Sequence, residues 1–383
     1  MGRFNILPND IMLEILTRLP TESVLNCKLV CTTWNNLVHH HPSFSQLHLN
    51  RLLISDAYDS GKFRFIVLSR ERGIIEMSYG EYDDDDCHDT LFSRITMINL
   101  SSPFVDYSFV GSCNGLVCFN ALIEDEGGYI YLYGPAFICN PITREYIILP
   151  EYEGQYWWTG FSYILSTNEY KIVRVYESGG DSNVGIVEVY TLGSGTGWRN
   201  AGTMDFDMNN VTNRVGAFAN GALHWADEKG TVVLAFHLAD EKFSEIPSPP
   251  PCLRRADVPY IEYEMKLGVL GNFLSAAFYY DTGDCDILLL KKNKDNNEFS
   301  WSKEFSFGNK ELTTEMTPVV LTKSGRLVYY GCGEIYSYDP ETSSAKVDPW
   351  FGKSISQVIH HKNTLVSLKV LGEKDTKTME SSE

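Results

Sequence analysis

A turn signature that returns about every fifty residues is the feature that most constrains what this chain of 383 residues can fold into. At five places an apolar or aromatic run ends in a short polar turn. These places stand 50, 47, 53 and 48 residues apart, at Asn140, Tyr190, His237, Leu290 and Tyr338. A fixed period of roughly 20–50 residues indicates that one supersecondary unit is repeated and that neighbouring units bury each other's apolar faces.

A second marker keeps the same period. Small turns followed by an apolar strand residue occur at Asn114-Gly115, Asn220-Gly221, Asn272 and Ser324-Gly325. The first interval spans two repeats, 106 residues from Gly115 to Gly221, and the next two are 51 and 53 residues. Two markers with one period predict a β-propeller, in which small antiparallel sheets stack around a ring.

The strand pattern supports this architecture. Runs rich in Val, Ile, Tyr and Phe alternate with Gly, Asn, Asp and Ser turns, as expected for short strands. They cover residues 63–68, 115–119, 130–133, 170–175, 185–190, 232–237, 286–290, 326–330 and 364–370. Convincing amphipathic helices are absent between them, which argues against a parallel βαβ sheet.

We expect six blades, from five clear repeats and a divergent one around residues 63–79. Seven would result if the strands near residues 356–370 close a further blade with N-terminal ones. The period is close to that of kelch blades, but the double glycine usual in kelch repeats is missing from most units, which indicates a diverged, kelch-like form.

The first fifty residues have a different, helical pattern. Apolar residues at Ile11, Ile15, Leu16 and Leu19 form one stripe that ends at Pro20. Thr21 is the expected N-cap of a second helix, and a third apolar stripe runs from Leu29 to Val38 before residues 39–42 break it. A module this small is marginally stable alone. Its apolar residues therefore bind a partner or pack on the rest of the chain.

The residues of this module closely resemble the F-box. In order, the matching residues are Leu7, Pro8, Asp10, Ile11, Glu14, Ile15, Leu16, Arg18, Leu19, Pro20, Ser23, Val24, Leu25, Lys28, Val30, Cys31, Trp34, Leu37 and Val38. One departure is Asn26-Cys27, where many relatives have a basic residue followed by Phe.

The resemblance implies that the module binds the Skp adaptor of a cullin–RING ubiquitin ligase. It also implies that the adaptor-facing and module-core residues include Leu7, Pro8, Ile11, Ile15, Leu16, Leu19, Pro20, Leu25, Val30 and Trp34. Sequence alone does not separate the two roles.

The β region is similar to the F-box-associated domain of plant F-box proteins, the group that includes the S-locus F-box proteins. The similarity is carried by residues 111–117, 139–144 and 170–175, and it extends over residues 105–327. The fold class expected is therefore α+β multidomain. It consists of a three-helix F-box (1–50), a mainly antiparallel propeller (51–372) and a disordered tail (373–383).

Charge and cysteine content narrow the partners and the compartment. The formal net charge of −18 counts against nucleic acid, whose binding needs clustered Lys and Arg, and against anionic membranes, and it favours a basic protein partner. Nine cysteines without a CxxC motif indicate reduced thiols. With no signal peptide and no spanning segment, we expect a soluble protein of the cytoplasm or nucleus.

Few residues point to chemistry of their own. Asp83–Asp86 could hold a basic target or a cation, but their spacing is more typical of a solvated turn, and neighbouring Cys87-His88 lacks a second pair at zinc spacing. No nucleophile elbow or phosphate-binding glycine loop is present. We therefore expect no catalytic residue, no metal and no cofactor.

An aromatic cluster offers the one candidate for substrate contact. Tyr156, Trp157 and Trp158 would anchor a protein partner if they lie on a loop between blades. The alternative is that they pack between blades, as most aromatic residues of the chain would.

The function expected is a non-catalytic substrate receptor. The F-box would bind the Skp adaptor and, through it, the cullin and RING subunits, while the propeller captures an unidentified protein for ubiquitination. The first alternative is an adaptor-bound scaffold or competitor that assembles no ligase. The second, a propeller enzyme, would need a metal or a carboxylate pair in the channel, which no motif supplies.

Overall fold

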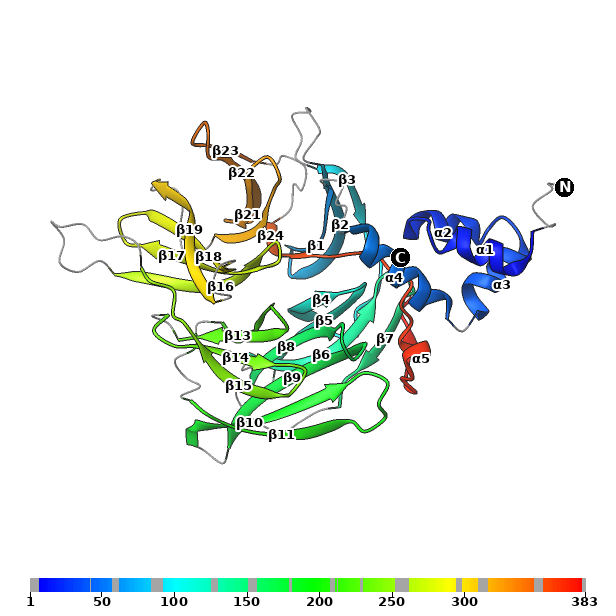
Figure 1. Ribbon diagram of the computed structural model, residues 1–383, viewed down its shortest axis with the longest axis horizontal. Helices are drawn as coiled ribbons and strands as arrows, with labels where there is room; N and C mark the ends of the chain where they lie inside the picture. The colour runs from blue at the N-terminus through cyan, green and yellow to red at the C-terminus, as the bar shows by residue number, and fades with distance from the viewer. Residues whose placement is uncertain are drawn as a thin grey trace.

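The computed structural model describes residues 7–41, 43–56, 62–83, 92–124, 130–150, 157–178, 181–206, 211, 213–227, 230–251, 262–293, 298–308, 316–347 and 354–380. A module of four helices lies at one side of a ring of antiparallel sheets (Figure 1). The helices are α1 (Asn9–Leu16), α2 (Thr21–Cys27), α3 (Thr32–His40) and α4 (Phe44–Asp56). No helix in the described ranges is both long and apolar enough to cross a membrane.

The ring contains six sheets, here called blades I to VI. Blade I contains β24 (Ser354–His360), β1 (Lys62–Glu71), β2 (Ile74–Asp83) and β3 (Phe92–Met97). Blade II contains β4 (Asp106–Cys113), β5 (Leu116–Glu124), β6 (Ile130–Asn140), β7 (Glu145–Ile148) and β25 (Lys377–Thr378). Blade III contains β8 (Trp157–Ile164), β9 (Glu169–Ser178), β10 (Asp181–Thr191) and β11 (Trp198–Asp205).

The other three blades follow in chain order. Blade IV contains β12 (Ala217–Ala219), β13 (Ala222–Ala226), β14 (Val233–His237) and β15 (Lys242–Ile246). Blade V contains β16 (Tyr263–Leu270), β17 (Phe273–Tyr280), β18 (Asp284–Lys292) and β19 (Phe299–Gly308). Blade VI contains β20 (Thr317–Leu321), β21 (Leu327–Gly331), β22 (Glu334–Asp339) and β23 (Ser344–Val347). The prediction of a six-bladed antiparallel propeller is confirmed.

The ring is closed by strands from both ends of the chain. The first strand of each blade contacts the first strand of the next, from β24 through β4, β8, β12, β16 and β20 back to β24. In blade I, β24 pairs with β1, so that Phe65 faces His360 and Arg70 faces Ser354. The C-terminal strand thus completes the first blade, and the alternative of a seventh blade is wrong.

Both sequence markers fall on equivalent turns. Asn140, Tyr190, His237, Leu290 and Tyr338 lie at or near the C-terminal ends of the third strands of blades II to VI. The Asn-Gly pairs form two-residue hairpin turns between the first and second strands. Asn114 and Gly115 have φ of 49° and 87°, and Asn220 and Gly221 have φ of 51° and 80°. Such turns need positive φ at both positions, which Asn and Gly tolerate best.

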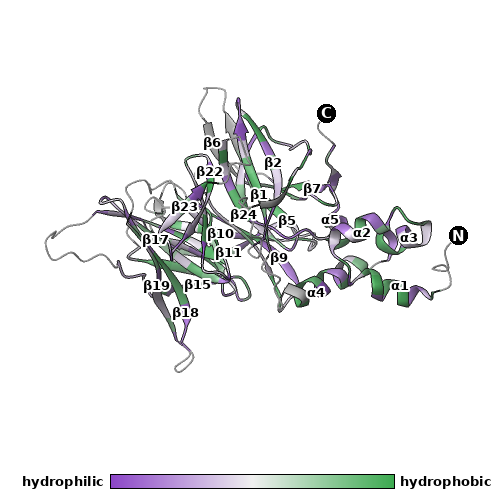
Figure 2. Cartoon of the chain, turned by 90° about the horizontal axis from the view of Figure 1, so that it is seen from above, coloured by the Kyte–Doolittle hydropathy of each residue, from purple (hydrophilic) through white to green (hydrophobic). Residues whose placement is uncertain are grey.

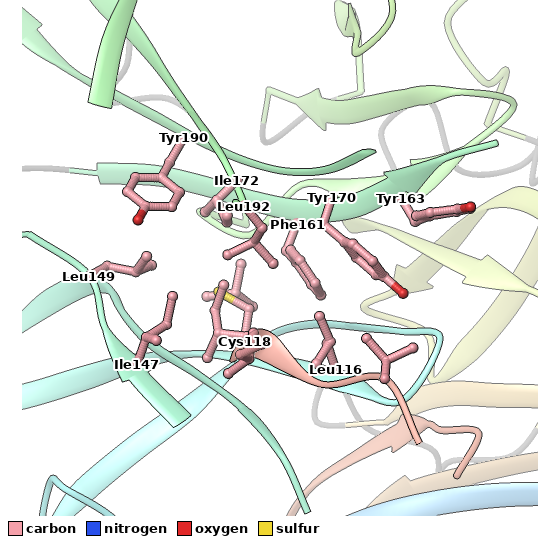
Figure 3. Packing of buried hydrophobic residues seen from close by; sticks show 14 of the residues in the cluster. Leu116, Cys118, Ile147, Leu149, Phe161, Tyr163, Tyr170, Ile172, Tyr190 and Leu192 are labelled. Carbon is pink, nitrogen blue, oxygen red and sulfur yellow. The ribbon is translucent and has the colours of Figure 1, made fainter. Parts of the chain in front are cut away.

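Each pair of neighbouring blades encloses one buried apolar cluster, so six clusters follow one another around the ring. Figure 3 shows the cluster between blades II and III, where Leu116 and Cys118 of β5 face Phe161 of β8, Tyr170 and Ile172 of β9. Both faces of every sheet are therefore covered, which explains why a single blade could not be stable by itself.

Three expectations about the chain ends are wrong. A fourth helix, α4, follows the three predicted ones and extends beyond residue 50. The expected strand at residues 364–370 is an extended stretch followed by the short helix α5 (Leu368–Leu371). The expected disordered tail at 373–383 is ordered through residue 380, because β25 pairs with β7 as a fifth strand of blade II.

Candidate functional site

Helix α1 presents an apolar stripe to solvent. Ile11 and Ile15 are 48% and 45% exposed, and their spacing of four residues places them on one side of the helix. Leu7, which precedes the helix, is 36% exposed and is counted here with this stripe. The carboxylate of Glu14 beside them binds the guanidinium groups of Arg18 and Arg51. The side-chain hydrogen bond from Arg18 and the charges of both arginines lower the pKa of Glu14. Apolar side chains framed by an ion pair are a typical protein-binding surface.

The structure separates the predicted residues of the module by their exposure to solvent. Among the predicted adaptor-facing and core residues, the exposed ones are Leu7, Pro8, Ile11, Ile15, Pro20 and Val30, and the half-buried ones are Leu19, Leu25 and Trp34. Leu16 has no exposed surface and belongs to the module core. Leu29 is 85% exposed beside Val30. It stands in the third apolar stripe, and sequence reasoning did not single it out as a site residue.

The core of the helical module includes a residue from the other end of the chain. Met12, Leu16, Val24 and Phe44 from the helices form one buried cluster with Leu365, which is 6% exposed. Leu365 belongs to the C-terminal segment, here defined as residues 361–380. The four helices alone therefore do not close their own core.

Hydrogen bonds fix the module to the C-terminal segment. The hydroxyl of Thr21 donates to the Asn363 carbonyl oxygen at 2.7 Å, and the Asn363 side-chain amide donates to Glu22 Oε1 at 2.8 Å. Thr21 is thus not the N-cap of α2 as predicted: it is the first helical residue, and Pro20 precedes it. Its hydroxyl instead joins the helical module to a residue 342 positions away.

Helix α4 contacts the propeller directly. Leu49 and Leu53 pack into the cluster between blades II and III, and the Gln46 amide donates to Asn168 Oδ1, in the β8–β9 turn, at 3.1 Å. The module therefore lies at the end of the ring where the first-to-second strand turns emerge. Because the strands are antiparallel, the second-to-third strand turns emerge at the opposite end.

The C-terminal segment is itself anchored along blades II and III. Asn140 Nδ2 donates to the carbonyl oxygens of Thr364 and Val366 at 3.1 and 2.7 Å. Farther along, the Glu373 carboxylate accepts from the Tyr190 hydroxyl at 3.0 Å and from the Gly193 amide at 2.7 Å. The segment therefore holds the module and two blades together.

A buried serine–histidine contact at the start of this segment has a structural role. The Ser112 hydroxyl lies 2.9 Å from His361 Nδ1, and His361 is 1% exposed. Burial lowers the pKa of His361 to about 3, so its ring is neutral at physiological pH. A ring closed off from solvent in this way has no access to a substrate.

The predicted substrate contacts divide differently. Tyr156 lies outside the described residues, as does the side chain of Trp157. Trp158 is 1% exposed and stacks on Trp225, with ring centroids 5.7 Å apart, in the cluster between blades III and IV. As a substrate contact Trp158 is a wrong prediction, since the alternative of packing between blades applies to it. Of the acidic run, Asp83 ends β2, and Asp84 to His88 lie outside the described residues.

The end of the ring opposite the helical module is acidic where its side chains are described. This end is formed by the last residue of each second strand, the turn after it and the first residue of the third strand, together with the links between blades. Five acidic residues, Glu71, Asp227, Asp281, Asp284 and Glu334, occupy the strand and turn positions against one basic residue, Arg72. This end would attract a basic surface.

The fold and the site define a class of protein: a small helical module with an exposed apolar stripe is fixed to a propeller. Comparison of the sequence with known protein families identifies the family. Residues 4–46 match the F-box domain, and residues 66–347 match the F-box associated beta propeller domain. The chain belongs to the F-box proteins that carry this propeller.

Curated relatives of this chain are also named as F-box proteins. F-box protein At3g07870 of Arabidopsis thaliana is 27% identical, over 80% of this chain and 74% of the relative. F-box/kelch-repeat protein At3g23880 of the same plant is 25% identical, over 88% of this chain and 91% of the relative.

A chain from the crystal structure of a nidogen/laminin complex aligns with a TM-score of 0.44 at 11% identity, covering 78% of this chain and 98% of that one.

Proposed function

We propose that this protein is the substrate-recognition subunit of an SCF-type cullin–RING ubiquitin ligase, acting in the cytoplasm or nucleus. The helical module binds the Skp adaptor, through which the cullin and RING subunits join. The propeller holds the protein to be ubiquitinated. The observation that carries the proposal is the exposed stripe of Leu7, Ile11 and Ile15 on a module with an F-box sequence.

The chain contributes position and no chemistry in this mechanism. Holding a substrate beside the ligase-bound ubiquitin conjugate raises the effective concentration of its lysines there. The buried contacts of α4 and of the C-terminal segment support this role, because they join the module that carries the adaptor-facing stripe to the blades.

The acidic end of the propeller supports the choice of substrate surface. It lies opposite the helical module, so a substrate bound there would not collide with the adaptor. Its carboxylates favour a target with a basic patch.

The test is a purification of the intact protein from native cell lysate beside a Leu7→Ala/Pro8→Ala variant, read by mass spectrometry. We expect adaptor and cullin with the wild type and neither with the variant. Proteins retained by both baits are substrate candidates. Recovery of the adaptor without the cullin would favour the scaffold alternative, and absence of the adaptor from both samples would refute the proposal.

A further inference from the structure

Helix α4 carries apolar residues on opposite sides. Phe44 and Leu49 are each 1% exposed and pack into the module core and into the cluster between blades II and III. Leu47 and Ile54 nevertheless point outward, with 41% and 61% of their surface exposed. Seven residues apart, they lie two turns from each other on one side of the helix. Two large apolar side chains exposed on one side of a helix whose other side is buried indicate that this side lacks a cover.

The exposed side of α4 is continuous with the apolar stripe of α1. Arg51 lies on the same side of α4 as Leu47 and Ile54, and it donates to both carboxylate oxygens of Glu14, at 2.8 and 3.0 Å. Glu14 is flanked by Ile11 and Ile15 on α1. Figure 2 shows α1 and α4 along the same side of the module. One ion pair therefore joins two apolar stripes.

Exposed apolar side chains are concentrated in this module. Of the sixteen large hydrophobic residues exposed within the described ranges, seven lie between residues 7 and 54: Leu7, Ile11, Ile15, Leu29, Val30, Leu47 and Ile54. Single exposed apolar residues are ordinary, whereas a contiguous group marks an interaction site.

We propose that Leu47 and Ile54 extend the adaptor-binding surface beyond the F-box motif, whose match ends at residue 46. The occupant is an apolar segment of the Skp-type adaptor, which binds α1 and α4 together. This inference rests on the proposed function and deepens it. Because Leu49 and Leu53 of the same helix pack between blades II and III, the adaptor then touches an element that is fixed in the propeller. Adaptor binding thereby orients the substrate-binding blades relative to the ligase.

The experiment measures the affinity of the purified full-length protein for a recombinant Skp-type adaptor by titration calorimetry. Leu47→Glu and Ile54→Glu are compared with Val347→Glu, which makes the same apolar-to-acidic change at a residue of blade VI that is 47% exposed. We expect each α4 variant to weaken binding about tenfold, or about 1.4 kcal/mol, and the double variant about a hundredfold. Val347→Glu should bind as the wild type does.

Ile11→Glu separates this inference from the proposed function. If Ile11→Glu abolishes binding while both α4 variants bind like the wild type, the inference is refuted and the proposed function stands. If the wild type does not bind the adaptor, both fail. Light scattering adds one more outcome: if the wild type self-associates, and the α4 variants lose only that self-association, a second copy of this chain covers α4 and the inference is overturned. Unchanged thermal unfolding of each variant shows that the side chain, and not the fold, was altered.

Discussion

Replacing Leu365 with alanine tests whether the C-terminal segment completes the core of the helical module. Leu365 is 6% exposed and packs with Met12, Leu16 and Phe44, which lie more than 300 residues earlier in the chain. If this contact is part of the module core, its loss should destabilise α1 to α4 and leave the blades far from it unaffected.

The size of the effect follows from the burial. Full burial of a leucine side chain contributes about 1.5–3 kcal/mol, and Leu→Ala in a core costs about 2–5 kcal/mol, depending on how far the site collapses. Leu365 keeps 6% of its surface exposed and is not fully buried, so we expect a value in the lower part of this range, about 2–3 kcal/mol. At about 1.4 kcal/mol per factor of ten, local opening becomes about 30- to 150-fold more frequent.

Hydrogen exchange read by mass spectrometry resolves this effect by region. Peptides of α1 to α3 should exchange about 30- to 150-fold faster in Leu365→Ala, and peptides of blades IV and V at the wild-type rate. Val370→Ala is the control, because Val370 belongs to the same segment but is 59% exposed. Equal exchange of the helical peptides in both variants would refute the shared core, as would a uniform loss of protection across the propeller.

Two further changes test the C-terminal segment and the propeller core. In Gly193→Ala the new Cβ would lie 1.8 Å from the Leu371 carbonyl oxygen and would push the C-terminal segment away. Gly195→Ala is the control, because its Cβ meets nothing within 4 Å and the backbone φ is nearly the same. Limited proteolysis should therefore cleave the C-terminal segment in the first variant and not in the second. Burial lowers the pKa of His224 to about 4, from a value near 6.5 in the unfolded chain. As the pH falls below about 6.5, the unfolded state therefore binds a proton that the folded state does not, and the free energy of unfolding decreases. Denaturant unfolding at pH 7 and pH 5 should show about 2 kcal/mol more loss in the wild type than in His224→Gln, and equal losses would contradict a buried neutral ring.

The propeller was predictable because its turn chemistry is local. Asn114-Gly115 and Asn220-Gly221 form hairpin turns that only a few residue types accommodate, and a single glycine with positive φ returns in the equivalent turns of blades V and VI, at Gly271 and Gly325. Period and blade number follow from those short signals. The F-box motif was equally accessible, since its residues are contiguous.

The missed features depend on contacts between distant residues. Helix α4 has apolar residues on more than one side, with polar residues between them, and therefore shows no helical period, because one side packs on the module and another on blades II and III. The sequence of the C-terminal segment predicts a strand and a polar tail. In the structure, hydrogen bonds with distant residues such as Asn140 and Tyr190 hold the segment in place. Trp158 illustrates the same limit: its burial against Trp225 depends on how blade III stacks on blade IV.

The closure of blade I by β24 has a consequence for synthesis on the ribosome. The helical module and β1 are synthesised before β24 and Leu365, so β1 has only β2 beside it, and the module lacks Leu365, until these later residues have been made. A chain that ends early therefore keeps an unpaired strand edge and an open apolar core, the features that lead to aggregation and degradation. Only a polypeptide that contains both β24 and Leu365 can close the ring and complete the core of the helical module, so the fold itself distinguishes such chains from shorter fragments.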